Sequence, residues 1–212
     1  MQSYKTYFTD KKFLISFFIG GALLTISLIV QYFASNYTAR SASESVTDII
    51  LSNTRVYDVS GIFIWGAVIL LVIGVAVCLA RVNYLPFAMK SVALFTLIRS
   101  LFVTLTHISP FPSSVLISSD FFKHTFFTGI FNGYDLFFSG HTGLPFLLAL
   151  MFWDNKKLRF LFLGFSILFA VIVLLGHLHY SIDVLAAYFI TYSIFQICKF
   201  FFKKDWELFL KK

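Results

Sequence analysis

Residues 61–80 read GIFIWGAVILLVIGVAVCLA, a run that contains no charged side chain. A helix that crosses a bilayer needs about 20 mainly apolar residues, because it satisfies its own backbone hydrogen bonds where water is absent. Five further stretches have a similar length and composition. The sequence therefore predicts an all-α integral membrane protein with one domain over residues 1–212, whose six transmembrane helices span about residues 13–33, 61–80, 87–108, 136–153, 158–175 and 181–202.

The composition of the whole chain agrees with a membrane location. Of the 212 residues, 58% are hydrophobic and 13% are charged, which leaves too little polar surface to coat a soluble globule. The net charge of +7 comes from Lys and Arg residues placed between apolar runs, so a membrane is the expected partner and nucleic acid is not. Cys78 and Cys198 lie inside apolar runs without CxxC spacing, which argues against a disulfide framework or a zinc site.

The distribution of basic residues predicts the orientation of the helices. Basic residues are retained on the cytoplasmic side of a membrane protein. A cytoplasmic N-terminus places all but four of the 17 Lys and Arg residues inside; the exceptions are Arg40, Arg55, Lys123 and, within the third span, Arg99. Six crossings then put both termini in the cytoplasm. We also expect the first apolar run, which follows Lys11 and Lys12, to be a retained anchor rather than a cleaved leader.

Two segments are predicted to lie outside the cytoplasm. Residues 34–60 are rich in Ser, Thr and Asn, and residues 109–135 contain two prolines and many aromatic residues. The aromatic residues suit either a short amphipathic piece in the membrane interface or a hydrophobic loop packed on the helices. They are Phe121, Phe122, Phe126, Phe127, Phe131 and Tyr134.

Ionisable residues gather at the ends of three predicted spans. His141 opens the fourth, His177 and His179 close the fifth, and Asp183 opens the sixth, all at the predicted outer face. Such groups are costly at membrane depth, so they indicate function. His179 and Asp183 are four residues apart, so a helix starting near His179 would let the carboxylate orient the imidazole and stabilise its positive charge during nucleophilic attack. His141 could then act as the general acid and base.

Other interpretations of these residues remain open. His179 and Asp183 could form an interfacial helix cap, with His141 as a satisfied polar residue at a helix start. Two histidines and a carboxylate are also a zinc ligand set, although the spacing favours a nucleophile and its orienter, and we expect no metal and no cofactor. His177 points elsewhere on a helix than His179 and is expected to be structural. His107 and His124 are expected to be loop or interface residues.

Two segments resemble motifs of the sphingomyelin synthase family, within the larger group of type 2 phosphatidic acid phosphatases and phosphotransferases. Ser139-Gly140-His141-Thr142, after Gly133 and Asp135, looks like the third motif, and His179-Tyr180-Ser181-Ile182-Asp183-Val184 looks like the fourth. Arg99 resembles the arginine-led second motif more loosely. The resemblance implies a phosphohistidine at His179, oriented by Asp183, with His141 as acid and base. The expected substrate-binding residues are Arg99, Asp135, Ser139 and Tyr180.

One departure from the wider group bears on the substrate. Its monoester phosphatases have a K-x6-R-P motif and an S-R-x5-H-x3-D motif, whose basic side chains clamp the phosphate. Here Ile172 and Val173 stand where the second motif has Ser and Arg, and Ser100 rather than Pro follows Arg99. A diester carries one charge and a monoester nearly two, so a thin cationic clamp favours the diester.

Together with the thin cationic clamp, the resemblance implies an enzyme that transfers the head-group phosphate of a phospholipid to a lipid hydroxyl or water. It also implies that the lipid enters sideways from the outer leaflet, and the predicted orientation has the site face the exterior, the periplasm or an organelle lumen. Arg99 could contact the phosphate, or it could pair with Asp135 or a backbone carbonyl. The alternatives are a lipid phosphate phosphatase that releases inorganic phosphate and a non-catalytic lipid-binding or transport protein.

Overall fold

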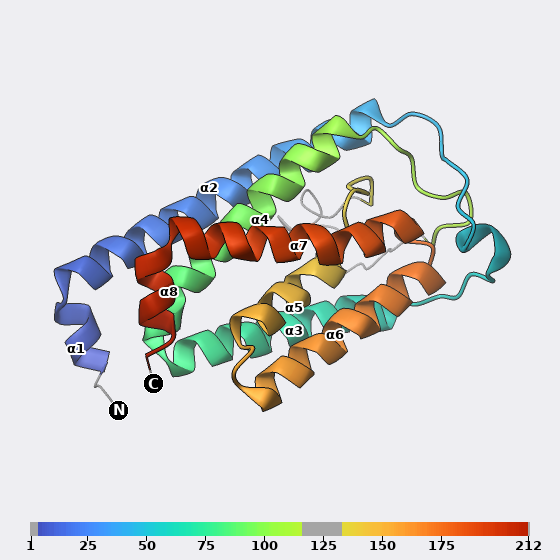
Figure 1. The fold of residues 1–212 in the computed structure, drawn as a ribbon. Coiled ribbons are helices and arrows are strands. Elements are labelled where there is room, and N and C mark those ends of the chain that lie inside the picture. The colour runs from blue at the N-terminus through green and yellow to red at the C-terminus, as the bar shows by residue number, and fades with distance from the viewer. Residues whose placement is uncertain (1–3, 116–132, 212) are drawn as a thin grey trace.

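The computed structural model describes residues 4–115 and 133–211, and every regular element in these two ranges is a helix (Figure 1). The all-α prediction is therefore confirmed for the described residues. Two single 3-10 turns, Leu51–Asn53 and Val82–Tyr84, accompany the α-helices. The α-helices are α1 (Tyr4–Thr9), α2 (Lys11–Ser41), α3 (Ser60–Ala80), α4 (Leu85–Leu105), α5 (Gly140–Met151), α6 (Lys156–Leu175), α7 (Ser181–Phe201) and α8 (Lys203–Phe209).

Five helices of the described chain are long and apolar enough to cross a membrane: α2, α3, α4, α6 and α7. Their large apolar side chains are widely exposed, as those of α3 illustrate with Trp65 at 60% and Val72 at 61%. A surface of this kind requires lipid around it. The helices thus indicate a multi-pass membrane protein, whereas six crossings and their orientation stay predictions.

The first and fourth predicted spans differ most from the structure. The first was predicted to end at residue 33, but α2 continues to Ser41, into the segment 34–60 that was expected to follow the helix. The fourth is shorter than predicted. The sequence predicts a helix over 136–153, but α5 is a twelve-residue helix that begins at Gly140. Ser139 is its N-cap and accepts a hydrogen bond from the backbone N–H of Thr142 at 3.3 Å. The carbonyls of Asp135 and Phe138 accept hydrogen bonds from Arg99 instead of continuing a helix. The first residues of this predicted span therefore form an irregular, non-helical segment, which the Arg99 side chain of α4 holds in place.

The helices pack in two groups that meet along α7 (Figure 1). In one group α2 lies along α4, where the Ser100 hydroxyl donates to Gln31 Oε1 at 2.9 Å. In the other, α5 packs against α6 and α7. The α5–α7 contact depends on Gly143, because a Cβ there would lie 2.8 Å from Thr191 Oγ1. This close approach brings the start of α5 beside α7.

The two ends of the bundle differ in what they carry (Figure 1). The first and last helices, α1 and α8, lie at one end, which we call the terminal end. At the other end α2 and α4 finish, α7 begins, and the irregular segment before α5 approaches. We call this the site end, because the predicted catalytic residues lie toward it.

Candidate active site

His179 and Asp183 form a buried pair at the start of α7. The ring Nδ1 of His179 lies 3.2 Å from Asp183 Oδ2 and 3.2 Å from the carbonyl oxygen of Leu136. The two residues are 7% and 1% exposed. Because both neighbours of Nδ1 are acceptors, this atom carries the proton and Nε2 carries the lone pair. Within residues 4–115 and 133–211, Nε2 makes no hydrogen bond, so the nitrogen needed as a nucleophile is not occupied by these residues.

Asp183 is itself held in place by backbone groups. The helix α7 begins at Ser181, which is the predicted start of the sixth span and lies two residues after His179. Asp183 Oδ2 accepts the N–H of Tyr180 at 3.1 Å and so caps the helix. The Asp183 carbonyl accepts the N–H of Ser139 at 3.2 Å, which connects the starts of α5 and α7. The Ser139 hydroxyl caps α5 and so has a structural role. Its backbone N–H places the same residue next to the His179–Asp183 pair.

His141 lies in the first turn of α5, in an aromatic setting. Its ring centroid is 4.1 Å from that of Phe63 on α3 and 5.6 Å from that of Phe169 on α6. Ser139, two residues before His141, donates its N–H to the Asp183 carbonyl at 3.2 Å. The structure therefore brings the segments that carry the three predicted catalytic residues together at the adjoining starts of α5 and α7.

Arg99 braces the irregular segment that precedes α5. Its Nη1 donates to Asp135 Oδ2 at 2.6 Å, its Nη2 to the Asp135 carbonyl at 2.7 Å, and its Nε to the Phe138 carbonyl at 3.0 Å. Both interpretations that placed Arg99 on protein partners, an Asp135 pair and a backbone carbonyl, are present together. A Cβ at Gly140 would lie 3.0 Å from Arg99 Nε, so the missing side chain there lets the guanidinium lie against the start of α5.

His177 and Tyr180 connect the segments that follow α2 and α4 to the start of α7. The His177 ring contacts the Ser113 hydroxyl through Nδ1 at 2.7 Å and the Thr54 hydroxyl through Nε2 at 3.3 Å. The Tyr180 hydroxyl donates to the Ser109 carbonyl at 2.8 Å and accepts the N–H of Val46 at 3.3 Å. The structural interpretation of His177 fits this arrangement. The Tyr180 hydroxyl, which we expected to contact substrate, instead bonds to these two backbone groups.

Asp48 is a site-supporting residue that the sequence analysis missed. Its Oδ2 accepts the N–H of Ser181 at 2.7 Å, and its Oδ1 accepts the N–H groups of Ile50 and Leu51 at 2.8 and 3.0 Å. Burial alone would raise the pKa of this carboxyl, but these hydrogen bonds outweigh it and hold the pKa below 3.8. Asp48 is therefore ionised at neutral pH and stabilises the positive N-terminus of α7. An Asp before Ile-Ile-Leu suggests a turn. Its hydrogen bond to Ser181, more than a hundred residues away, could not be predicted from the local sequence.

Other predicted residues lie apart from this cluster. The backbone carbonyl of His107 accepts hydrogen bonds from the N–H and hydroxyl of Ser43, and its ring packs against Tyr37. His124, Lys123 and the aromatic residues 121–131 lie outside the described residues. Among residues 4–115 and 133–211, no three His, Cys, Asp or Glu side chains come together as a set that could hold a metal ion.

A comparison with protein families places this geometry in context. Residues 134–200 match the family model described as PAP2 superfamily C-terminal. The match includes α5, α6 and α7 and both segments that carry the histidines. It supports the PAP2 superfamily, whose members are phosphatases and phosphotransferases, and hence an enzyme, without indicating one branch of that superfamily. Searches of curated proteins and of solved structures found no match.

Proposed function

We propose that this chain is a membrane-embedded lipid phosphotransferase that forms a phosphohistidine at Nε2 of His179. The observation that carries the proposal is the 3.2 Å contact between His179 Nδ1 and Asp183 Oδ2, which leaves Nε2 with its lone pair. The negative charge of Asp183 would stabilise the imidazolium that develops during attack. The match of residues 134–200 to the PAP2 superfamily supports the same chemistry.

The reaction would proceed in two displacements. In the first, Nε2 of His179 attacks phosphorus, the P–N bond forms, and the bond from phosphorus to the leaving oxygen breaks while His141 gives that oxygen a proton. In the second, an acceptor hydroxyl loses its proton to His141 and attacks phosphorus, and the P–N bond breaks. The proton on Nδ1 stays with His179 throughout, shared with Asp183 and the Leu136 carbonyl.

The charge around the site favours a phosphodiester substrate. Arg99, which lies against the start of α5, is already paired with Asp135 at 2.6 Å, so this cation offers little positive charge to a doubly charged phosphate. The N-terminus of α5 offers backbone N–H groups and a partial positive charge, which suit a singly charged group. We therefore infer a phospholipid donor that enters sideways from the outer leaflet and an acceptor that is a lipid hydroxyl or water, as in a sphingomyelin synthase-like transfer.

The proposal can be tested on purified protein in detergent with a phospholipid labelled at its phosphate. We expect label on a lipid acceptor or in a released head-group phosphate, together with an acid-labile phosphoenzyme. His179→Ala should abolish the phosphoenzyme, and Asp183→Asn should slow its formation. Lys203→Gln, an exposed change at the terminal end, is the matched control and should behave as wild type.

Two results would replace the proposal. Release of inorganic phosphate from a lipid monoester but not from a diester, lost in His141→Ala, would establish the phosphatase alternative. Absence of turnover and of phosphoenzyme in the wild type, with lipid binding unchanged in His179→Ala, would establish the non-catalytic alternative.

A further inference from the structure

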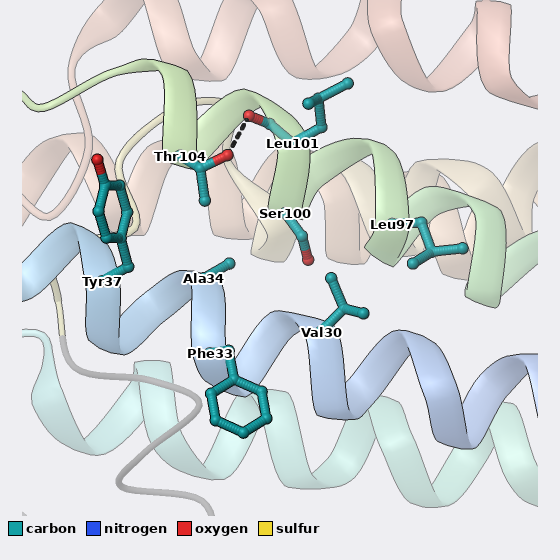
Figure 2. Close-up of a pocket in the computed structure, with 8 residues that line it drawn as sticks. All are labelled: Val30, Phe33, Ala34, Tyr37, Leu97, Ser100, Leu101 and Thr104. Atoms are coloured by element: carbon teal, nitrogen blue, oxygen red, sulfur yellow. Dashed lines mark hydrogen bonds between the residues drawn. The ribbon is translucent and has the colours of Figure 1, made fainter.

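Two apolar grooves run along α4, one beside α2 and the other beside α7. The first, of about 450 Å³, lies between α2 and α4 (Figure 2). In Figure 2, Ala34 and Val30 of α2 point toward Ser100 of α4. The second, of about 320 Å³, lies between α4 and α7, and we call it the α4–α7 groove. It is lined by Ile98, Phe102, Phe189, Ile190, Ser193, Ile194 and Ile197.

The α4–α7 groove continues the side of α7 that carries Asp183. Ile190, Ile194 and Ile197 follow Asp183 by 7, 11 and 14 residues, a spacing that keeps all four on one stripe of an α-helix. On α4, Phe102 follows Arg99 by one turn. Both walls of the groove thus extend from helix positions that face the candidate active site.

Aromatic contacts connect Phe102, a lining residue of the groove, to the candidate active site. The ring of Phe102 lies 5.8 Å from that of Phe137 and 6.1 Å from that of Phe138, measured between centroids. These phenylalanines belong to the segment whose Leu136 carbonyl contacts His179 Nδ1. The α2–α4 groove has no comparable connection among the described residues, because Ser100 turns from the site toward Gln31.

The depth and polarity of the α4–α7 groove match a lipid chain. Its α7 residues begin six and end 14 residues after Asp183, which corresponds to about 9–21 Å along the helix axis. One leaflet of the hydrocarbon core is about 15 Å deep. The one hydroxyl on the lining, that of Ser193, donates to the Phe189 carbonyl at 3.0 Å, so the groove presents an apolar wall.

We propose that the α4–α7 groove holds one acyl chain of the substrate lipid while the phosphate lies at His179. This inference rests on the proposed phosphotransferase function and adds the site that binds the lipid tail. Such a groove should bind long acyl chains more tightly than short ones, because each additional methylene that packs against Ile and Phe side chains adds van der Waals contacts. A donor with short chains leaves the lower groove empty and gains none of them.

The test compares donors that share a head group and differ in acyl-chain length. In Ser193→Phe an aromatic ring fills the groove, and we expect the ratio of kcat/KM for the long-chain donor to that for the short-chain donor to fall about tenfold, through KM. Thr104→Phe is the matched control: Thr104 lines the α2–α4 groove, and its hydroxyl likewise bonds to its own helix, at the Leu101 carbonyl. Its ratio should equal that of wild type.

Several outcomes would overturn the inference while leaving the proposed function intact. An unchanged ratio in Ser193→Phe, or an equal change in Thr104→Phe, would do so as long as His179→Ala still abolishes turnover of the short-chain donor. If Ser193→Phe does not fold, Ile197→Phe replaces it. Loss of the proposed function itself would appear instead as no turnover of either donor by wild type.

A second measurement requires no turnover. A phospholipid with a photoactivatable group in the middle of one acyl chain is irradiated with wild-type protein in detergent. We expect a saturable adduct on the α7 peptide that contains residues 189–197, competed by unlabelled long-chain lipid. Labelling that does not saturate, or that is equal on the α2–α4 groove, would mark general lipid contact and overturn the inference.

Discussion

The helix α4 carries a buried ion pair toward each of its ends, and the two pairs hold very different parts of the chain. Arg99 and Asp135 meet at 2.6 Å at the site end, and Lys90 and Asp205 meet at 2.6 Å at the terminal end. The two cations are nine residues apart, about 13.5 Å along the axis and about half a turn around it. They therefore point to opposite sides of α4.

The difference lies in what each carboxylate belongs to. Asp135 lies in an irregular segment, and Arg99 also donates to two backbone carbonyls there, which suits the several directed donors of a guanidinium. Asp205 lies in α8, and the compact ammonium of Lys90 donates both to it and, at 2.7 Å, to the Ser16 hydroxyl of α2. The Ser16 hydroxyl in turn donates to Asp205 Oδ1 at 2.5 Å. One pair shapes the backbone beside His179, and the other fixes a short helix. Burial of an ion pair alone thus does not identify a functional site.

Among the variants that test this contrast, Asp135→Ala should have the largest effect on turnover. Removal of this carboxylate leaves the buried Arg99 charge without its ionic partner and weakens the contact that holds the segment supplying the Leu136 carbonyl to His179. A shift of about 1 Å in catalytic groups can lower a rate about 100-fold, and we expect a loss of this size in kcat. Steady-state transfer of labelled phosphate, normalised to folded protein, measures it. Turnover within twofold of wild type would show that the site does not depend on this pair.

Arg99→Lys should have a smaller effect. An ammonium can keep the Asp135 ion pair but cannot reproduce the directed hydrogen bonds to the Asp135 and Phe138 carbonyls. We expect turnover to fall about tenfold, which corresponds to about 1.4 kcal/mol. The reciprocal change at the terminal end, Lys90→Arg, is the control and should leave kcat unaltered. An equal loss in both variants would argue that α4 responds as one unit.

Asp48→Ala should lower turnover a few-fold and stability modestly. It removes the acceptor of three backbone N–H groups, including that of Ser181 at the start of α7. We expect the Tm to fall by about 2–4 °C, which corresponds to about 1 kcal/mol for a chain of this size. The folded-state pKa of Asp48 is lowered, so its stabilisation is complete above the ordinary value of 3.8 and is lost as pH falls through the folded value.

The Asp48 effect has its own control in pH. The difference in Tm between wild type and Asp48→Ala should be largest near neutral pH and shrink once the pH drops below 3.8. A gap that widens in acid would contradict the assigned hydrogen bonds. Asp48→Asn retains one acceptor oxygen and should lie between the two.

Much of the fold was predictable because apolar length and charge placement are local properties of a membrane helix. The predicted spans 61–80, 158–175 and 181–202 agree with α3, α6 and α7 to within two residues at each end. The start of α5 was not predictable in the same way. The fragment from Leu136 to Ser139 is apolar enough to continue a helix, and it does not because Arg99, distant in sequence, binds its backbone.

The candidate site also contains features that follow from local sequence spacing and features that do not. The pairing of His179 with Asp183 follows from a spacing of four residues, so the sequence predicted it. Asp48, the Leu136 carbonyl and the tether of His177 to Ser113 depend on segments far apart in the chain. No periodicity encodes such contacts. The sequence therefore indicated which residues could do chemistry, and the structure added which residues position them.

Of the variants that remove a carboxylate, Asp205→Ala should have the smallest effect on turnover, although its effect on stability should be substantial. The variant leaves the Lys90 ammonium buried with the Ser16 hydroxyl as its remaining described hydrogen-bond partner. Breaking a buried pair from one side typically costs about 3–5 kcal/mol, so thermal unfolding in detergent should occur at a clearly lower temperature than for wild type. Turnover per folded molecule should stay within twofold, because α8 and the start of α7 lie at opposite ends of the bundle (Figure 1). A loss comparable to that of Asp135→Ala would mean that α8 is coupled to the site, and the contrast between the two ends of α4 would no longer hold.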